Sequence, residues 1–183
     1  MKLSILICTI PSRSEMLKKL TQQLTLLFGK YDESEWEVLI QPDENINVGQ
    51  KRNILLQKAS GDFVVFIDDD DEIHDNYIDA FMDAISCNPD ADCIGYRGYI
   101  TFDGNSRKDW VISKECETWH EKDGVYYRTP NHISPVKRQI ALQVMFPQSD
   151  FGEDYVYSRG ILPYLRTEVF IDEQLYHYKF MAK

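Results

Sequence analysis

The sequence predicts an α/β protein built on a mostly parallel sheet flanked by helices, followed by an irregular mixed α+β C-terminal half. In about residues 1–96, short apolar runs alternate with stretches of helical periodicity, as in the crossover connections of a parallel sheet. In about residues 97–183, stretches of period two replace that alternation, as in antiparallel strands. The chain has 183 residues and no linker-like segment, so we expect a single domain whose halves meet near residue 96.

Four apolar runs in the first half are predicted to be strands. Their composition is nearly continuous rather than alternating, which indicates burial on both faces of a sheet. Pro11 and Pro42 follow the first two runs. They are expected to end these strands, because proline cannot continue the hydrogen bonding of a central strand. The four runs are Leu3–Ile10, Trp36–Gln41, Phe63–Ile67 and Ala91–Tyr96.

Three helices are predicted between these strands. Each carries apolar residues at helical spacing, which places them on one face. Gly29 ends the first helix, as expected of glycine at a helix C-terminus, and the side chain of Asp75 is expected to cap the third. The helices are Ser14–Phe28, Val48–Ala59 and Asp75–Ser86.

The second half contains both kinds of element. Alternation of apolar and polar residues predicts strands at Tyr99–Phe102, Trp110–Ser113 and Thr167–Phe180. Helical spacing predicts helices at Pro135–Met145 and Tyr155–Leu165. These elements form the irregular half of the predicted fold.

Composition and charge argue against several classes of protein. The formal net charge is −10, with 20 Lys and Arg against 30 Asp and Glu, which disfavours a duplex nucleic acid partner. The first apolar run is far shorter than the about 20 residues of a membrane-spanning helix, and it does not resemble a signal peptide. The four cysteines lack zinc-site spacing, so we expect reduced thiols in a cytoplasmic protein.

Four consecutive aspartates, Asp68–Asp71, follow the apolar run Phe63–Ile67. Ligands of open α/β sheets bind outside the carboxyl ends of the strands, which is where these side chains are expected. Adjacent carboxylates repel one another unless they share a cation, and Mg²⁺ and Mn²⁺ prefer oxygen ligands. The acidic run therefore predicts a divalent-metal site, the alternative being a solvated turn before the helix at Asp75.

Several short motifs follow one another along the chain. They are the strand end Cys8–Arg13, the helix start Gly49–Asn53, the turn Ala59–Asp62, the acidic run Ile67–Asp71 and the Glu-Asp pair within Phe151–Tyr155. In this order they resemble the motifs of GT-A fold glycosyltransferases of family 2, in which the acidic run corresponds to the Asp-x-Asp signature. The resemblance covers nearly the whole chain. It implies transfer of a sugar from a nucleotide-diphosphate sugar to an acceptor hydroxyl, with inversion of the anomeric centre.

The resemblance assigns roles within the acidic run. It implies that Asp70 contacts a divalent ion, Mn²⁺ or Mg²⁺, and the donor diphosphate, while Asp68 contacts the ion or the donor's ribose or sugar. Asp69 and Asp71 remain alternatives, because four consecutive aspartates leave the register open. His177 is expected to complete the metal shell, with a half-buried strand histidine as the alternative.

The Glu-Asp pair is expected to supply the catalytic base. The resemblance implies that Asp154 removes the proton of the acceptor hydroxyl, and Glu153 beside it would raise the pKa of either carboxyl group through like-charge repulsion. Glu153 is the alternative base. The structural alternative is that both residues counter the dipole at a helix N-terminus.

A further set of residues is expected to bind the nucleotide sugar. Asp43 would contact the nucleoside, although an aspartate in a turn after Pro42 is an equal alternative. Arg13, Lys51 and Arg52 could reach the diphosphate or the base, the alternative being solvated surface charges. The complete set is Thr9, Pro11, Arg13, Asp43, Lys51, Arg52, Asp68 and Asp69.

The region between residues 96 and 127 is rich in aromatic residues. Aromatic faces stack on sugar rings, so these residues could form an acceptor platform, but packing in the core is the commoner use of such side chains. They are Tyr96, Tyr99, Trp110, Trp119, Tyr126 and Tyr127. His120 and His132 have no motif around them and receive no role.

The expected partners are a nucleotide-diphosphate sugar, above all a UDP-sugar, and a glycan or other hydroxyl acceptor. We expect no transmembrane segment and no further C-terminal domain of the kind found in many relatives. One alternative is a nucleotidyltransferase, although only Ser12 and Arg13 follow the first strand where a glycine-rich or basic signature would be needed. An Asp-x-Asp phosphatase would carry its motif on the first strand. A non-catalytic nucleotide-sugar-binding module would not need Asp154.

Overall fold

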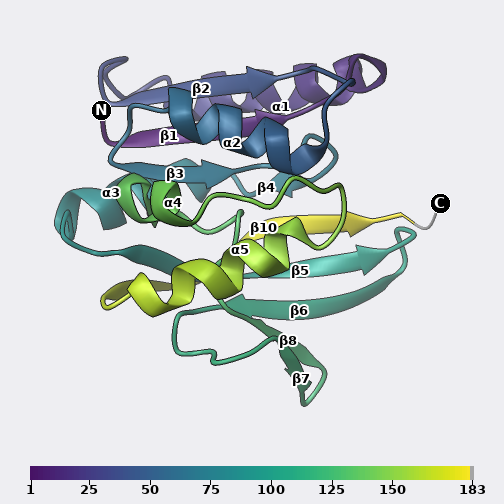
Figure 1. The fold of residues 1–183 in the computed structure, drawn as a ribbon, viewed down its shortest axis with the longest axis vertical. Helices are drawn as coiled ribbons and strands as arrows, with labels where there is room; N and C mark the ends of the chain where they lie inside the picture. Colours follow the sequence, from purple (N-terminus) through teal and green to yellow (C-terminus); the bar gives the residue numbers. More distant parts are fainter. Residues whose placement is uncertain (182–183) are drawn as a thin grey trace.

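The structure is a computed structural model and describes residues 1–181. A ten-stranded sheet runs through the molecule, with helices in front of it and behind it (Figure 1). In the described residues no helix is both long enough and apolar enough to cross a membrane. The architecture confirms the expected α/β class, and the pairing of its strands is mixed.

The first part of the sheet is parallel. β2 (Trp36–Gln41), β1 (Leu3–Cys8) and β3 (Phe63–Phe66) lie side by side in that order. The register on both sides of β1 is continuous. The three strands therefore end at the same edge of the sheet, where the segments that follow them meet.

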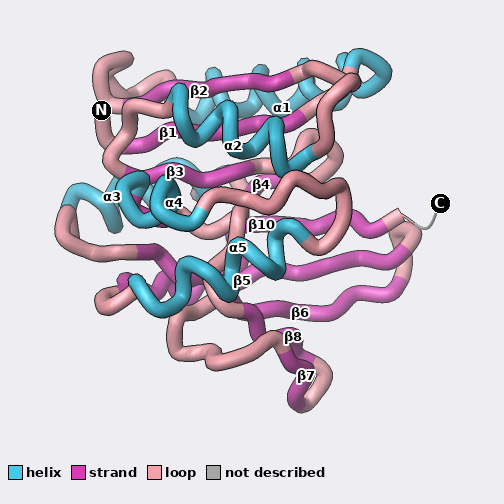
Figure 2. Tube along the Cα trace, viewed as in Figure 1, coloured by secondary structure: helices cyan, strands magenta, loops and turns pink. Residues whose placement is uncertain are grey.

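The second part of the sheet is mixed. A two-residue strand, β9 (Val136–Lys137), lies between β3 and β5 (Cys93–Phe102) and runs antiparallel to both. β6 (Ser106–Ile112) pairs antiparallel with β5, and β8 (Val125–Arg128) pairs parallel with β6. β7 (His120–Lys122) forms a hairpin with β8 at the end of the sheet farthest from β2 (Figure 2).

The long last strand brings the C-terminal segment next to the acidic run. β10 (Glu168–Phe180) runs parallel to β5 over most of its length. It also pairs antiparallel with the short β4 (Glu72–Ile73), which directly follows the four aspartates. The backbone of β10 is therefore close to the segment that leaves β3.

Helices cover both faces of the sheet (Figure 1). α1 (Ser14–Phe28) and α3 (Tyr77–Cys87) pack on one face. α2 (Val48–Lys58), α4 (Arg138–Val144) and α5 (Glu153–Ile161) pack on the other face. The start of α5 lies close to the start of α2, and this contact assembles the site described below.

The strands divide their side chains between two apolar layers. In β1, Ile5 and Ile7 belong to the layer under α1 and α3, while Leu6 belongs to the layer under α2, α4 and α5. Full burial of one such aliphatic side chain contributes roughly 1.5–3 kcal/mol. The double layer therefore fixes the strand ends on which the site is built.

Most predicted elements lie within a few residues of their expected bounds. The prediction that Asp75 caps the third helix is wrong: α3 begins at Tyr77, and its N-cap residue is Asn76. The side chain of Asn76 makes no capping hydrogen bond within residues 1–181, and its Nδ2 donates to Oε2 of Glu173 at 2.7 Å. β5 runs without a break from Cys93 to Phe102, so the predicted strands on either side of residue 96 are one strand.

Candidate active site

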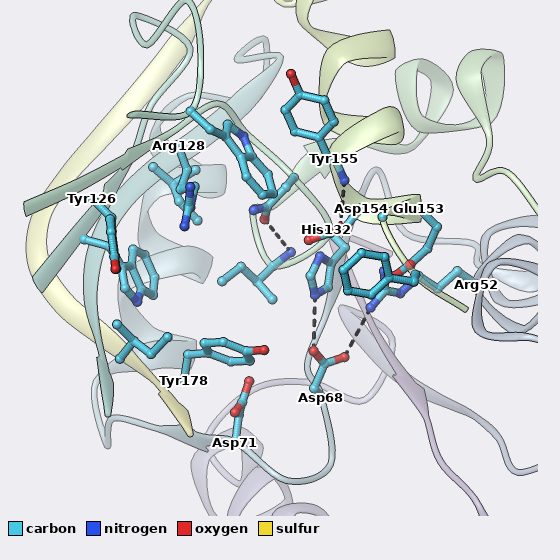
Figure 3. Close-up of a pocket in the computed structure, with 18 of the residues that line it drawn as sticks. Arg52, Asp68, Asp71, Tyr126, Arg128, His132, Glu153, Asp154, Tyr155 and Tyr178 are labelled. Carbon is cyan, nitrogen blue, oxygen red and sulfur yellow. Dashed lines mark hydrogen bonds and ion pairs between the residues drawn. The ribbon is translucent and has the colours of Figure 1, made fainter. Parts of the chain in front are cut away.

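A pocket of about 640 Å³ lies outside the carboxyl end of β3 and extends along β6 and β8 (Figure 3). One wall carries Arg52, Asp68 and His132, and the opposite wall carries Tyr126 and Arg128. The first turn of α5 and the loop before it also line the pocket. The position is the one at which open α/β sheets bind their ligands.

Arg52 joins the first wall to the start of α5. A capping box between Asn47 and Gln50 fixes the start of α2, and Arg52 follows in the second turn of that helix. Only 4% of the Arg52 side chain is exposed, and its guanidinium lies 2.6 Å from Oε1 of Glu153 and 3.4 Å from Oδ1 of Asp68. One guanidinium therefore links two carboxylates that are distant in the sequence.

Asp68 is held by two partners. Besides Arg52, Nε2 of His132 lies 3.2 Å from Oδ2 of Asp68. Burial alone would raise the pKa of Asp68, but the charges and hydrogen bonds of His132 and Arg52 outweigh it and hold that pKa well below its usual range. Asp68 is therefore an anion at neutral pH.

The Glu-Asp pair at the start of α5 is split between two environments. Gly152 precedes the pair with φ at 76°, a left-handed conformation that favours glycine and allows a sharp entry into the helix. Both residues line the pocket (Figure 3), but Glu153 is buried and paired with Arg52, whereas Asp154 is half-buried. Oδ1 of Asp154 accepts a hydrogen bond of 2.7 Å from the backbone N of Tyr155, and no side chain in residues 1–181 forms an ion pair with it.

The aspartates at the second and fourth positions of the acidic run are buried. Oδ2 of Asp69 lies 2.5 Å from Oγ1 of Thr9, and Oδ1 lies 2.8 Å from the guanidinium of Arg13. Asp71 accepts hydrogen bonds from the backbone N of Lys179 and from the hydroxyl of Tyr176, each at 2.8 Å. Both carboxylates are thus bound within the protein.

The aspartates at the first and third positions are more accessible. The side chain of Asp68 is 26% exposed and that of Asp70 is 37% exposed. Burial raises the pKa of Asp70 above its usual value, and Arg13, 3.0 Å away, only partly offsets it. Accessible and buried carboxylates therefore alternate along the run.

The acidic run does not form a complete metal cage. Among residues 1–181, no three or more His, Cys, Asp or Glu side chains are arranged as a metal site. The guanidinium of Arg13 is the cation that Asp69 and Asp70 share. A divalent ion that takes one or two protein carboxylates and completes its shell with substrate phosphates and water fits this arrangement. The partly exposed carboxylates of Asp68 and Asp70 could hold such an ion only in exchange for contacts with Arg52 or His132 and with Arg13.

His177 has other partners. Its Nδ1 lies 3.0 Å from Oε2 of Glu72, and its Nε2 lies 2.8 Å from Oγ1 of Thr101. The ring stacks on Tyr99 with centroids 4.3 Å apart. Within the described residues, no hydrogen bond or ion pair joins His177 to the run Asp68–Asp71.

The other predicted nucleotide-binding residues follow β1 and β2 or, in the case of Lys51 in α2, contact the end of β1. Lys51 is buried and its Nζ donates to the carbonyl O of Thr9 at 2.8 Å, which holds the end of β1. Pro11 is exposed and begins the 3₁₀ turn before α1. Asp43 is exposed after β2, where its Oδ1 accepts a hydrogen bond of 2.9 Å from N of Asn45. These residues border the same edge of the sheet but do not line the pocket.

Two residues without a predicted role, His132 and Arg128, line the pocket. The carbonyl O of His132 accepts a hydrogen bond of 2.8 Å from N of Phe66 in β3, a contact between distant segments that leaves no local signature. The position of Arg128 in the pocket could have been predicted from the alternation of side chains along β8, which places it on the same face as Tyr126. Tyr126 and Arg128 line this pocket, while Tyr127 between them lines a different one.

The aromatic residues of the second half serve both expected uses. Trp110, Trp119 and Tyr126 line the pocket. Tyr96 is fully buried in the apolar core, and Tyr99 packs on β10. These three aromatic residues come from β6, β8 and the segment before β7, and Phe151, Tyr155 and Tyr178 complete the aromatic lining from the α5 region and β10.

The profile described as Glycosyl transferase family 2 matches residues 13–147 of the chain. The search of curated proteins with this chain found no match. Among solved structures, S. aureus TarS 1-349 in complex with UDP-GlcNAc is 16% identical with a TM-score of 0.75, and the match covers 100% of this chain and 60% of that one. The complex of the same fragment with UDP is 16% identical with a TM-score of 0.73, covering 98% of this chain and 60% of that one. The likeness establishes the fold, and the chain spans about 60% of the length of these structures.

Proposed function

The chain belongs to glycosyltransferase family 2, and from that premise we propose that it moves a sugar from a nucleotide-diphosphate sugar to an acceptor hydroxyl. The observation that carries the proposal is the split Glu-Asp pair. Arg52 neutralises Glu153 at 2.6 Å, while Asp154 lines the pocket without a cationic partner in residues 1–181. A general base needs this arrangement, because its charge has to be available to the proton that it removes.

The proposed reaction is a single in-line displacement. The oxygen of the acceptor hydroxyl attacks the anomeric carbon, and the bond from that carbon to the donor's phosphate oxygen breaks. The nucleoside diphosphate leaves with the electron pair of that bond. Asp154 accepts the proton of the hydroxyl during the attack. Because the acceptor approaches opposite the leaving group, the anomeric configuration is inverted.

We propose that the donor binds along the edge formed by the ends of β1, β2 and β3. The residues with this role are Thr9, Pro11, Arg13, Asp43, Lys51, Arg52, Asp68 and Asp69. They follow three neighbouring parallel strands or contact the residues that do. A UDP-sugar is the proposed donor, because the similar TarS structures are complexes with UDP-GlcNAc and UDP. A glycan or another hydroxyl compound is the proposed acceptor.

We further propose that Mn²⁺ or Mg²⁺ binds at Asp68 and Asp70. Their accessible carboxylates suit a hard cation that takes its other ligands from a diphosphate. The bound ion would offset the negative charge of the departing diphosphate. Arg13 would then exchange the carboxylate of Asp70 for a donor phosphate. His177 stays a candidate third ligand that would first have to leave Glu72 and Thr101.

We also propose a cytoplasmic location. The four cysteines are free thiols, which are typical of a reducing compartment. Burial raises the pKa of Cys8 to about 12, so this thiol is protonated and unreactive.

Transfer assays with a matched pair of variants test the proposed base. We expect the chain to release UDP from a UDP-sugar faster when an acceptor mixture is present. Asp154→Asn should lower transfer by about 10²–10⁴-fold and leave the affinity for UDP unchanged. Asp83→Asn, which alters an exposed carboxylate on α3, is the control and should keep full activity.

The same assay separates the alternatives. Full transfer by Asp154→Asn would contradict the assignment and make Glu153 the next candidate base. Binding of nucleotide sugars without turnover would indicate a non-catalytic binding module. Release of pyrophosphate from a nucleoside triphosphate would indicate a nucleotidyltransferase.

A further inference from the structure

Arg128 forms no ion pair within residues 1–181, although the protein is acidic. Acidic residues outnumber Lys and Arg by 30 to 20, and four other arginines form ion pairs with carboxylates, namely Arg13, Arg52, Arg97 and Arg107. Arg128 is half-buried at the end of β8 and lines the pocket. Within residues 1–181 its guanidinium makes no hydrogen bond or ion pair. Its hydrogen-bonding groups are therefore available to a ligand.

Aromatic rings hold the guanidinium in place. Its central carbon lies 4.5 Å from the ring centroid of Trp119 and 5.0 Å from that of Tyr126. The indole Nε1 of Trp119 donates a hydrogen bond of 2.8 Å to Oγ1 of Thr129, which is fully buried and bonded to Ser158 of α5. The rings of Trp119 and Tyr126 thus hold the guanidinium in one position, and the hydrogen bond of Trp119 connects them to the buried core.

The surroundings leave the charge of Arg128 incompletely solvated. Burial lowers the pKa of its guanidinium, and the negative charge of Asp154 acts in the opposite direction. Figure 3 shows Arg128 beside Tyr126, across the cavity from Arg52 and Asp68. A guanidinium presents parallel N–H groups that match two oxygens of a phosphate or carboxylate. An oxyanion at this point would restore the interactions that burial removes.

We propose that Arg128 binds a phosphate or carboxylate group of the acceptor, so that the natural acceptor is an anionic hydroxyl compound. The proposal rests on the proposed function, because Arg128 and Asp154 line the same pocket. The acceptor would place its hydroxyl at Asp154 and its oxyanion at Arg128. The donor's diphosphate is the other source of an oxyanion in this reaction. It is disfavoured because the donor residues follow β1, β2 and β3, whereas Arg128 lies in the opposite wall, on β8.

Binding of small probes to the whole chain tests the proposal independently of transfer. Glucose 6-phosphate, glucuronate and glucose are titrated at constant ionic strength, and the indole N–H signal of Trp119 is followed by NMR. We expect both anions to bind about ten- to a hundredfold more tightly than glucose, the effect of a charge-assisted bidentate contact. Arg128→Gln should reduce the affinity for the anions to that for glucose. Arg128→Lys should restore part of the affinity for the anions, because lysine keeps the positive charge but lacks the two parallel N–H groups of the guanidinium.

Arg107→Gln is the matched control. Arg107 also lies over an aromatic ring, 3.9 Å from the centroid of Tyr99, but it is paired with Asp109 and does not line the pocket. This variant should keep the full preference for the anions. Equal affinity for glucose and glucose 6-phosphate, or an unchanged preference in Arg128→Gln, would overturn the proposal.

A titration with UDP distinguishes the two sources of an oxyanion. Arg128→Gln should leave the affinity for UDP unchanged if the group serves the acceptor. Loss of UDP affinity with retained preference for glucose 6-phosphate would assign Arg128 to the donor and overturn the proposal. If the chain transferred no sugar, the proposed function would be wrong, but the measured preference for anions would be unaffected. Failure of the proposed function can therefore be distinguished from failure of the proposal for Arg128.

Discussion

The two walls of the pocket differ in how they hold charged side chains. On the side of β3, Arg52 and Asp68 form ion pairs within the protein, and Asp71 accepts two hydrogen bonds. On the side of β8, Arg128 lies against aromatic rings without an ion pair or hydrogen bond in residues 1–181. Asp154, at the start of α5, also lacks an ionic partner among the described residues.

The difference indicates how each wall responds to change. In a closed network, loss of one member leaves another charge buried without its partner, so substitutions there are strongly destabilising. A cation held by aromatic faces can be replaced without leaving such a charge behind. We therefore expect substitutions in the wall on β3 to lower the free energy of unfolding strongly, and substitution of Arg128 in the wall on β8 to lower it little.

The largest expected effect compares the two arginines. Arg52→Gln should lower the free energy of unfolding by about 3–5 kcal/mol, because Glu153 stays buried without its cation. Arg128→Gln should lower it by no more than about 1 kcal/mol, the value of a partly exposed cation–π contact. Urea unfolding at one pH measures both. Adding Glu153→Gln to Arg52→Gln should recover part of the loss, since the unpaired charge is removed. Equal losses for the two single variants would contradict the comparison.

The next effect separates donor binding from transfer. Asp70→Asn removes an accessible carboxylate from the proposed metal site, so the manganese-dependent part of UDP affinity should disappear while the fold is retained. Asp154→Asn should keep that part, because Asp154 is proposed to face the acceptor. Calorimetric titration with UDP, with and without manganese, measures both variants. If the unsubstituted chain binds UDP equally well in a chelator, the proposed metal site is wrong.

Much of the fold could be predicted because its signals are local. α1 and β2 have the expected bounds, Ser14–Phe28 and Trp36–Gln41, since apolar periodicity marks their length and Gly29 and Pro42 follow them. The short strands could not be predicted in this way. β9 has two residues and is a strand only because β3 and β5 flank it on both sides.

The candidate site shows the same division. The order of the motifs singled out Arg52, Asp68, Glu153 and Asp154, and all four line one pocket. The sequence could not show which aspartates of the acidic run are accessible. That property depends on partners from other segments, namely Thr9 and Arg13 for Asp69 and β10 for Asp71. For the same reason, His132 as a partner of Asp68 could not be predicted.

A smaller effect distinguishes two aspartates of the acidic run by their pH dependence. The folded-state pKa of Asp68 lies below its usual value, so its stabilisation is present above about pH 4 and is lost as the pH falls. Burial, together with the charge of Asp68, raises the pKa of Asp71 well above its usual value. The contribution of protonated Asp71 to the stability of the folded state is therefore complete below about pH 4 and is lost as the pH rises.

Asp71→Asn should accordingly improve stability relative to the unsubstituted chain more at about pH 8 than at about pH 4. Asp68→Asn should be more harmful at about pH 7 than at about pH 3. Urea unfolding across this range measures both dependences. Parallel pH profiles for the two variants would show that the two carboxylates do not differ as described.

The smallest expected effect concerns His177, which the sequence offers as a third metal ligand. Release of its ring from Glu72 and Thr101 would sacrifice two hydrogen bonds, each contributing about 0.5–1.5 kcal/mol, and this loss offsets most of what a new metal bond provides. His177→Gln should therefore weaken manganese binding in the presence of UDP by only several-fold. Thr101→Val removes the partner of the His177 Nε2 atom but keeps the ring, and should strengthen manganese binding slightly. Calorimetric titration of manganese into the UDP complex measures both changes. If manganese affinity stays constant in both variants while His177→Gln lowers the free energy of unfolding, then His177 is structural, and Asp68 and Asp70 are the only protein ligands proposed for the ion.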